Sequence, residues 1–101
     1  MIKSEITDKF GNKIVITEER WSHIVIRHPD MAKNYKFVEK AITNPTVVAR
    51  NTFDRNINFY HKYFKELNRF VVVIINITKK FVITAYLAES VKQGEVVWKA
   101  K

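Results

Sequence analysis

The chain has 101 residues, enough for a single domain with one hydrophobic core. Its hydrophobic content of 47% argues against intrinsic disorder, and the absence of cysteine excludes disulfides and thiolate metal sites. Eighteen lysines and arginines face ten aspartates and glutamates, which gives a formal net charge of +8. A small domain this basic attracts polyanions, nucleic acids above all.

The N-terminal stretch predicts a short β-hairpin. Residues 2–7 and 13–17 alternate polar and apolar side chains, as half-buried strands do. Between them Gly11 and Asn12 suit the positive φ angles of a tight turn. The first residues contain no signal-peptide core, and the longest apolar run, Phe70–Ile75, is too short to span a bilayer. We therefore expect a cytoplasmic protein without a membrane partner.

Two helices are expected next. Thr17 can cap a helix that runs to His28, and Pro29 ends it. Asp30 can cap a second helix through about Thr43, because apolar residues recur there with helical spacing.

After the helices the apolar period changes to two, which indicates strands. The predicted strands are Thr46–Asn51, Asn56–Phe64, Arg69–Ile77 and Lys80–Leu87, with Glu95–Lys99 as a short addition. Short links favour antiparallel pairing, and the continuously apolar run Phe70–Ile75 is typical of a central strand covered on both faces. The sequence thus predicts one α+β domain over residues 1–101. It combines a short N-terminal hairpin, two helices and a four-stranded antiparallel sheet.

The end of the first helix gathers His23, Arg27 and His28 within six residues. Cleavage of RNA by its own 2′-hydroxyl needs a base, an acid and a cation on the phosphate. Histidine, with a reference pKa near 6.5, suits the first two roles, and arginine suits the third. Each histidine taken alone is equally well explained as a structural residue, and either one can be the base. The two are five residues apart without a carboxylate to complete a ligand set, so no metal or cofactor is expected.

The predicted sheet adds further candidates. Tyr60 and Lys62 share one face of a strand, where they can form an RNA-contacting surface or simply a half-buried sheet. Thr84 and Tyr86 place two hydroxyls on one face of another strand, where they can orient a phosphate. Further basic side chains expected to contact RNA are Arg50, Arg55 and Lys99.

The chain from Trp21 to Lys99 resembles the phage-type nucleases of the barnase–EndoU–colicin–RelE superfamily. The resemblance is carried by Trp21-Ser22-His23-Ile24, by Arg27-His28-Pro29-Asp30, by a helix ending near Asn44-Pro45, by a strand with Tyr60 and Lys62, and by Phe81-Val82-Ile83-Thr84-Ala85-Tyr86. It implies two helices followed by a four-stranded antiparallel sheet, and metal-independent RNA cleavage, often in a toxin. The catalytic residues that it implies are His23, Arg27, His28, Tyr60, Lys62, Thr84 and Tyr86.

These observations together predict an endoribonuclease from a toxin system, phage or mobile element. It would cleave RNA by attack of the ribose 2′-hydroxyl on the adjacent phosphate. Two alternatives stay open: a non-catalytic nucleic-acid-binding module, and a basic protein that docks an acidic partner such as an antitoxin or immunity protein. An exposed edge strand at Thr46–Asn51 would also allow a homodimer.

Overall fold

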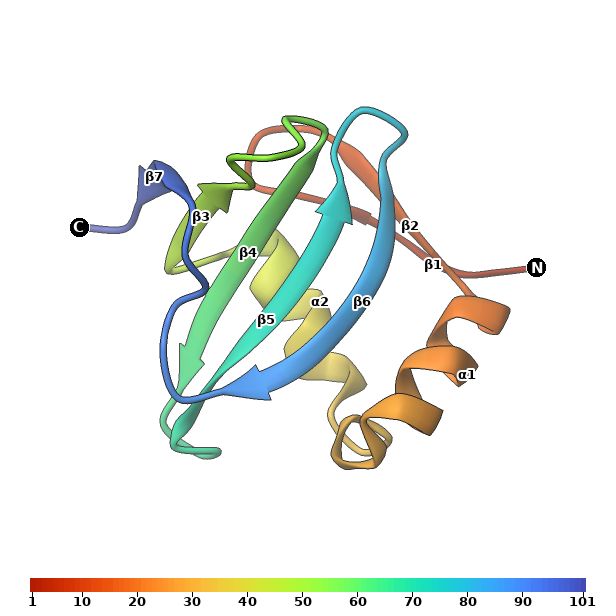
Figure 1. The fold of residues 1–101 in the computed structure, drawn as a ribbon. Coiled ribbons are helices and arrows are strands. Elements are labelled where there is room, and N and C mark those ends of the chain that lie inside the picture. Colours follow the sequence, from red (N-terminus) through yellow and green to blue (C-terminus); the bar gives the residue numbers. More distant parts are fainter.

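The computed structural model describes residues 1–101 and shows helices covering one face of a single curved sheet (Figure 1). In chain order the elements are β1 (Ile2–Thr7), β2 (Lys13–Thr17), α1 (Glu18–Arg27), the 3-10 helix η1 (Pro29–Met31), α2 (Tyr35–Thr43), β3 (Val47–Arg50), β4 (Ile57–Phe64), β5 (Arg69–Asn76), β6 (Phe81–Ala88) and β7 (Glu95–Lys99). None of the helices is long and apolar enough to cross a membrane.

The sheet has seven strands in the order β1-β2-β6-β5-β4-β3-β7. The α+β class with two α-helices is confirmed, but the expected four-stranded sheet was too small. The hairpin joins it because β2 runs parallel to β6, pairing Val15 with Phe81, and the Val15 N–H donates to the carbonyl of Lys80 at 3.0 Å. At the other end β7 pairs antiparallel with β3, so β3 is not the free edge that was expected to pair subunits.

Helix α1 begins as predicted and ends one residue early. The Thr17 hydroxyl accepts a hydrogen bond from the Arg20 N–H at 3.1 Å, which caps the first turn. The helix ends at Arg27, and His28 is its C-terminal cap residue.

The predicted second helix is divided in two. Asp30 lies inside η1 and makes no capping bond, contrary to expectation, because Pro29 starts a tight 3-10 turn just before it. Asn34 breaks the helical path, and its side-chain Nδ2 donates to the Asp30 carbonyl at 2.8 Å. Helix α2 therefore starts only at Tyr35.

The main core lies between the helices and the sheet. It joins Ile24 of α1 and Val38 of α2 to buried side chains of the central strands, such as Val73. A smaller cluster around Phe59 and Ile74 covers the opposite, outer face of the sheet. The predicted covering of β5 on both faces is thereby confirmed.

The 89–94 segment links β6 to β7 on the outer face of the sheet. It is anchored where the Lys92 N–H donates to the buried ring of His61 on β4 at 2.9 Å. This segment and the outer face of the sheet line a pocket that is described in the next section.

Candidate functional site

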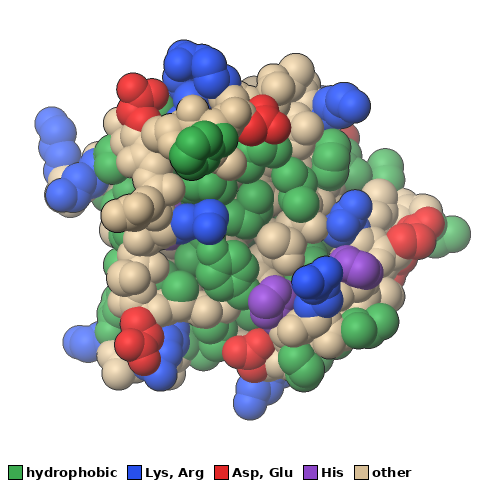
Figure 2. Space-filling view, in the orientation of Figure 1, with side chains coloured by type: hydrophobic (Ala, Val, Ile, Leu, Met, Phe, Trp, Pro, Cys, Tyr) green, Lys and Arg blue, Asp and Glu red, His purple; other side chains and the backbone are tan.

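A cleft between α1 and β6 brings together His23, Arg27, His28, Thr84 and Tyr86, which the sequence singled out as catalytic. We call it the α1–β6 cleft. It has a volume of about 380 Å³ and is lined by Arg20, His23, Arg27, His28, Ile83, Thr84 and Tyr86. Histidine side chains (purple) gather with cationic ones (blue) on this face of the molecule near α1 (Figure 2). No carboxylate lines the cleft, so its charge is wholly cationic.

Helix α1 supplies one wall of the cleft. Arg20, His23 and Arg27 are three and four residues apart and therefore lie on one face of the helix. Arg20 was missed by the sequence analysis, although its spacing to His23 and Arg27 was a usable signal. Its position in the first turn is fixed by the Thr17 cap.

The junction between α1 and η1 holds His28 against the sheet. The His28 N–H donates to the Ile24 carbonyl at 2.7 Å, and its half-buried ring lies 5.6 Å from the ring of Tyr86, centroid to centroid, at 33°. Ring stacking and the backbone bond together restrict where the imidazole can point.

Strand β6 supplies the opposite wall through a β-bulge. Ile75 pairs with Val82 and Ile74 with Thr84, so Ile83 is an extra residue on β6. As a result Ile83 and Thr84, although consecutive, both line the cleft together with Tyr86. Burial raises the pKa of the Tyr86 phenol, so its hydroxyl stays protonated at neutral pH and can donate a hydrogen bond.

Two of the predicted catalytic residues are not brought into the cleft. Lys62 lies on β4, two strands away from β6 in the sheet, with its ammonium 6.0 Å from the Phe64 ring. Tyr60 is fully buried on the helix-covered face, and its hydroxyl donates to Asp8 Oδ2 at 2.5 Å. Burial and the neighbouring Asp8 carboxylate raise the pKa of Tyr60.

Asp8 is the centre of a structural network. Besides the Tyr60 hydroxyl it accepts the N–H groups of Phe10 and Asn12 and the Asn12 side-chain amide. The network fastens the β1–β2 turn to β4. Its geometry gives Tyr60 a clear structural role.

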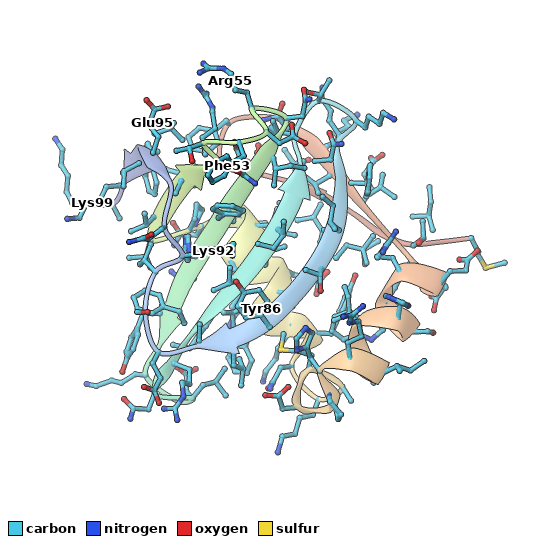
Figure 3. All side chains as sticks on the ribbon, viewed as in Figure 1. Phe53, Arg55, Tyr86, Lys92, Glu95 and Lys99 are labelled. Atoms are coloured by element: carbon cyan, nitrogen blue, oxygen red, sulfur yellow. The ribbon has the colours of Figure 1, made fainter.

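The cations predicted to bind RNA, Arg50, Arg55 and Lys99, lie on the β3–β7 side of the sheet. Figure 3 shows Arg55 and Lys99 on the side away from α1, with Tyr86 nearer the cleft. Arg50 Nη1 is 3.8 Å from Glu95 Oε1, whereas Arg55 and Lys99 have no ion-pair partner. These residues are too far around the sheet to belong to the cleft itself.

A second and larger hollow was not anticipated from the sequence. We call it the β4–β7 pocket; its volume is about 670 Å³, and it is lined by Asn51, Thr52, Phe53, Phe59, Val91, Lys92, Gln93, Gly94 and Val96. Its walls come from three separate segments, so no local pattern marks it.

His61 ties the 89–94 segment to the sheet beside this pocket. Its Nε2 accepts the Lys92 N–H, and its Nδ1 lies 3.2 Å from the Val47 carbonyl, which assigns the proton to Nδ1. Burial lowers the pKa of His61, because the charged imidazolium would lose its water and the Lys92 bond.

The pH dependence of stability should reveal this neutral histidine. Below about pH 6.5 the unfolded chain binds a proton that native His61 refuses, so the free energy of unfolding should fall as the pH drops towards the lowered pKa of the folded state. A His61→Gln variant should lose that part of the slope. Urea unfolding of both proteins at neutral and mildly acidic pH measures how much the free energy of unfolding changes with pH. An equal change in the two proteins would contradict a neutral His61 in the folded state.

The described residues contain no cluster of three or more His, Cys, Asp or Glu side chains that could hold a metal ion. Comparison of the chain with protein-family models, with curated proteins and with solved structures found no match.

Proposed function

We propose that the protein is a metal-independent endoribonuclease with its catalytic centre in the α1–β6 cleft. The observation that carries the proposal is the meeting of His23, Arg27, His28 and Tyr86 in one cationic cleft. These residues come from the end of a helix and from a strand more than fifty positions further along the chain, and their side chains suit acid–base and phosphate chemistry. The resemblance to phage-type nucleases of the barnase–EndoU–colicin–RelE superfamily supports the same centre and an origin in a toxin system, phage or mobile element.

The proposed reaction is an in-line transfer at phosphorus. One imidazole takes the proton of the ribose 2′-hydroxyl, whose oxygen forms a bond to phosphorus. The bond from phosphorus to the 5′-oxygen breaks, and the other imidazole protonates that oxygen. The products are a 2′,3′-cyclic phosphate and a 5′-hydroxyl.

The other side chains of the cleft stabilise the phosphorane. Arg20 and Arg27 offer guanidinium N–H groups to the non-bridging oxygens, where negative charge increases in the transition state. The hydroxyls of Thr84 and Tyr86 complete the donor set from the strand side.

A second candidate function is RNA binding without turnover, which the formal net charge of +8 also favours. A third is docking of an acidic protein such as an antitoxin or immunity protein. An antitoxin partner is compatible with either of the first two functions.

The test is incubation of the purified protein with total tRNA and with mixed single-stranded RNA in EDTA. We expect cleavage, with 2′,3′-cyclic phosphate ends identified by mass spectrometry of the products. Salt-sensitive binding without cleavage would support the binding module instead. No affinity for RNA together with a co-purifying acidic protein would support the docking protein.

Replacement of Arg20 tests the cationic wall of the cleft. Arg20→Ala removes a charge-assisted hydrogen bond to phosphate, so kcat/KM should fall about tenfold or more. Lys62→Ala is the matched control, since Lys62 lies outside the cleft, and its kcat/KM should stay within about twofold. The opposite ranking of the two variants would move the phosphate site to β4.

A further inference from the structure

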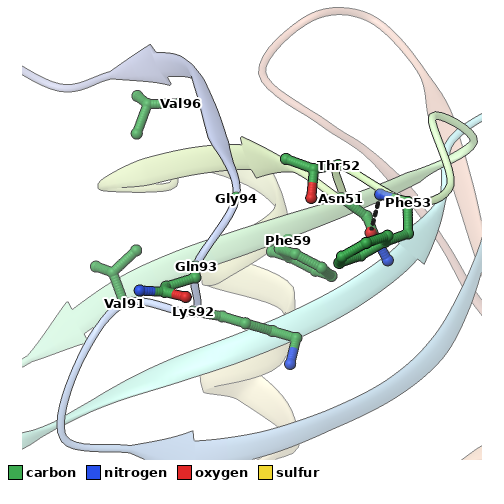
Figure 4. A pocket seen from close by; sticks show the side chains of 9 residues that line it. All are labelled: Asn51, Thr52, Phe53, Phe59, Val91, Lys92, Gln93, Gly94 and Val96. Carbon is green, nitrogen blue, oxygen red and sulfur yellow. Dashed lines mark hydrogen bonds between the residues drawn. The ribbon is translucent and has the colours of Figure 1, made fainter.

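The β4–β7 pocket is lined by two phenylalanines, of which one is exposed on the surface. Phe53, in the loop after β3, is 98% exposed, whereas Phe59 of β4 is buried, with 3% of its surface exposed. Both rings and the Lys92 side chain line the pocket (Figure 4). A phenylalanine exposed to this degree contributes little to the core, so its ring is free to contact a ligand at the pocket.

The pocket is held open by its backbone. The Phe53 N–H donates to Asn51 Oδ1 at 2.8 Å, which fixes the loop after β3. On the other wall Gly94 lies so close to β3 that an added Cβ would be 2.6 Å from the Arg50 carbonyl oxygen. The hydrogen bond from the Lys92 N–H to the His61 ring holds the same wall against β4. Both walls are thus positioned without a ligand.

Lys92 lines the pocket, and Arg55 follows Phe53 by two residues. The Lys92 ammonium lies 5.3 Å from the centre of the Phe59 ring and forms no ion pair, and Arg55 has none either. The nearby acids are engaged elsewhere, Glu95 with Arg50 and Asp54 with the Asn56 N–H at 3.0 Å. The free cations and the exposed Phe53 ring match the two halves of a nucleotide, a phosphate and a flat base.

We propose that the β4–β7 pocket binds an unpaired base of an RNA strand, separately from the α1–β6 cleft. The base stacks on Phe53, the Asn51 Nδ2 and the Gln93 side-chain amide are offered to its polar edge, and Lys92 contacts the adjoining phosphate. This inference rests on the proposed function, because it assumes that the strand cut in the cleft also crosses the sheet.

The width of the sheet between the two sites sets the minimum length of the RNA. The path from β6 crosses β5 to reach β4 and then β3. Because neighbouring β-strands are about 4.8 Å apart, the distance from β6 is roughly 10 Å to β4 and 14 Å to β3. Successive stacked nucleotides are about 3.4 Å apart, so a dinucleotide in the cleft cannot fill the pocket and a longer strand can. The outer-face side chains Ile83 and Ile74 line the way between the two sites.

The first experiment compares substrates of two lengths. We expect Phe53→Ala to lower the ratio of kcat/KM for a single-stranded RNA of about twelve nucleotides to kcat/KM for mixed dinucleotides by about tenfold. Ile26→Ala is the matched control, because Ile26 is 76% exposed on α1 and lines neither hollow, and it should leave the ratio unchanged. An unchanged ratio in Phe53→Ala would overturn the subsite.

A binding experiment separates this inference from the proposed function. Fluorescence anisotropy of the same labelled RNA is measured with the His23→Ala/His28→Ala protein, with and without Phe53→Ala. About tenfold weaker binding on loss of Phe53 supports the subsite even if the wild-type protein cuts nothing. Cleavage by the wild type together with unchanged binding by Phe53→Ala refutes the subsite and leaves the nuclease standing.

Discussion

Replacing both cleft histidines, His23→Ala with His28→Ala, should lower kcat for RNA cleavage by about 10³-fold, because the acid and the base are removed together. Neither side chain belongs to the buried core, so the double variant should fold with a circular dichroism spectrum like that of the wild type. The measurement is single-turnover cleavage of a single-stranded RNA in EDTA.

The single variants sharpen this prediction. If one histidine is the acid and the other the base, each single replacement should lose nearly as much activity as the double one, because the two act as a unit. Ile26→Ala on the same helix serves as the control. Full activity in the double variant would show that the cleft is not the catalytic centre.

Tyr60→Phe should reduce the free energy of unfolding by about 2 kcal/mol. The change removes the buried hydroxyl that donates to Asp8 and leaves the carboxylate with fewer donors. Tyr63→Phe is the matched control, since the Tyr63 hydroxyl donates to Asn68 Oδ1 at 2.6 Å on the exposed surface, and its loss should be within about 0.5 kcal/mol. Urea unfolding measures both values.

The Tyr60→Phe variant also tests the role of Tyr60 in catalysis. Because its hydroxyl is directed at Asp8 and not at the cleft, folded Tyr60→Phe protein should keep the kcat of the wild type within about twofold. A large loss of kcat with unchanged stability would restore Tyr60 to the catalytic set that the sequence suggested.

The elements predicted correctly from the sequence are those specified by neighbouring residues. The alternation around Gly11 marks the hairpin, the Thr17 cap marks the start of α1, and the apolar run Phe70–Ile75 marks the central strand. The helical half of the cleft followed for the same reason, since His23 and Arg27 share a helix face by spacing alone.

The features that the sequence did not predict depend on contacts between distant segments. The parallel attachment of β2 to β6 rests on one register pair, which leaves no periodic trace in either strand. Alternation along β4 does not show which of its two faces meets the helices. In the structure the face that carries Tyr60 meets them, so Tyr60 lies in the core. Strict alternation also conceals the bulge at Ile83, which brings two consecutive side chains to one wall of the cleft.

Thr17 has two roles that together couple the motion of the β1–β2 hairpin to that of α1. It is the last residue of β2 and also the cap of α1, so the hairpin and helix α1 share one residue without a linker. Local opening of the hairpin would therefore uncap α1 and loosen the first turn that carries Arg20. We therefore expect the Asp8–Tyr60 bond, which is remote from the cleft, to limit the fluctuations of the helix that forms one wall of it.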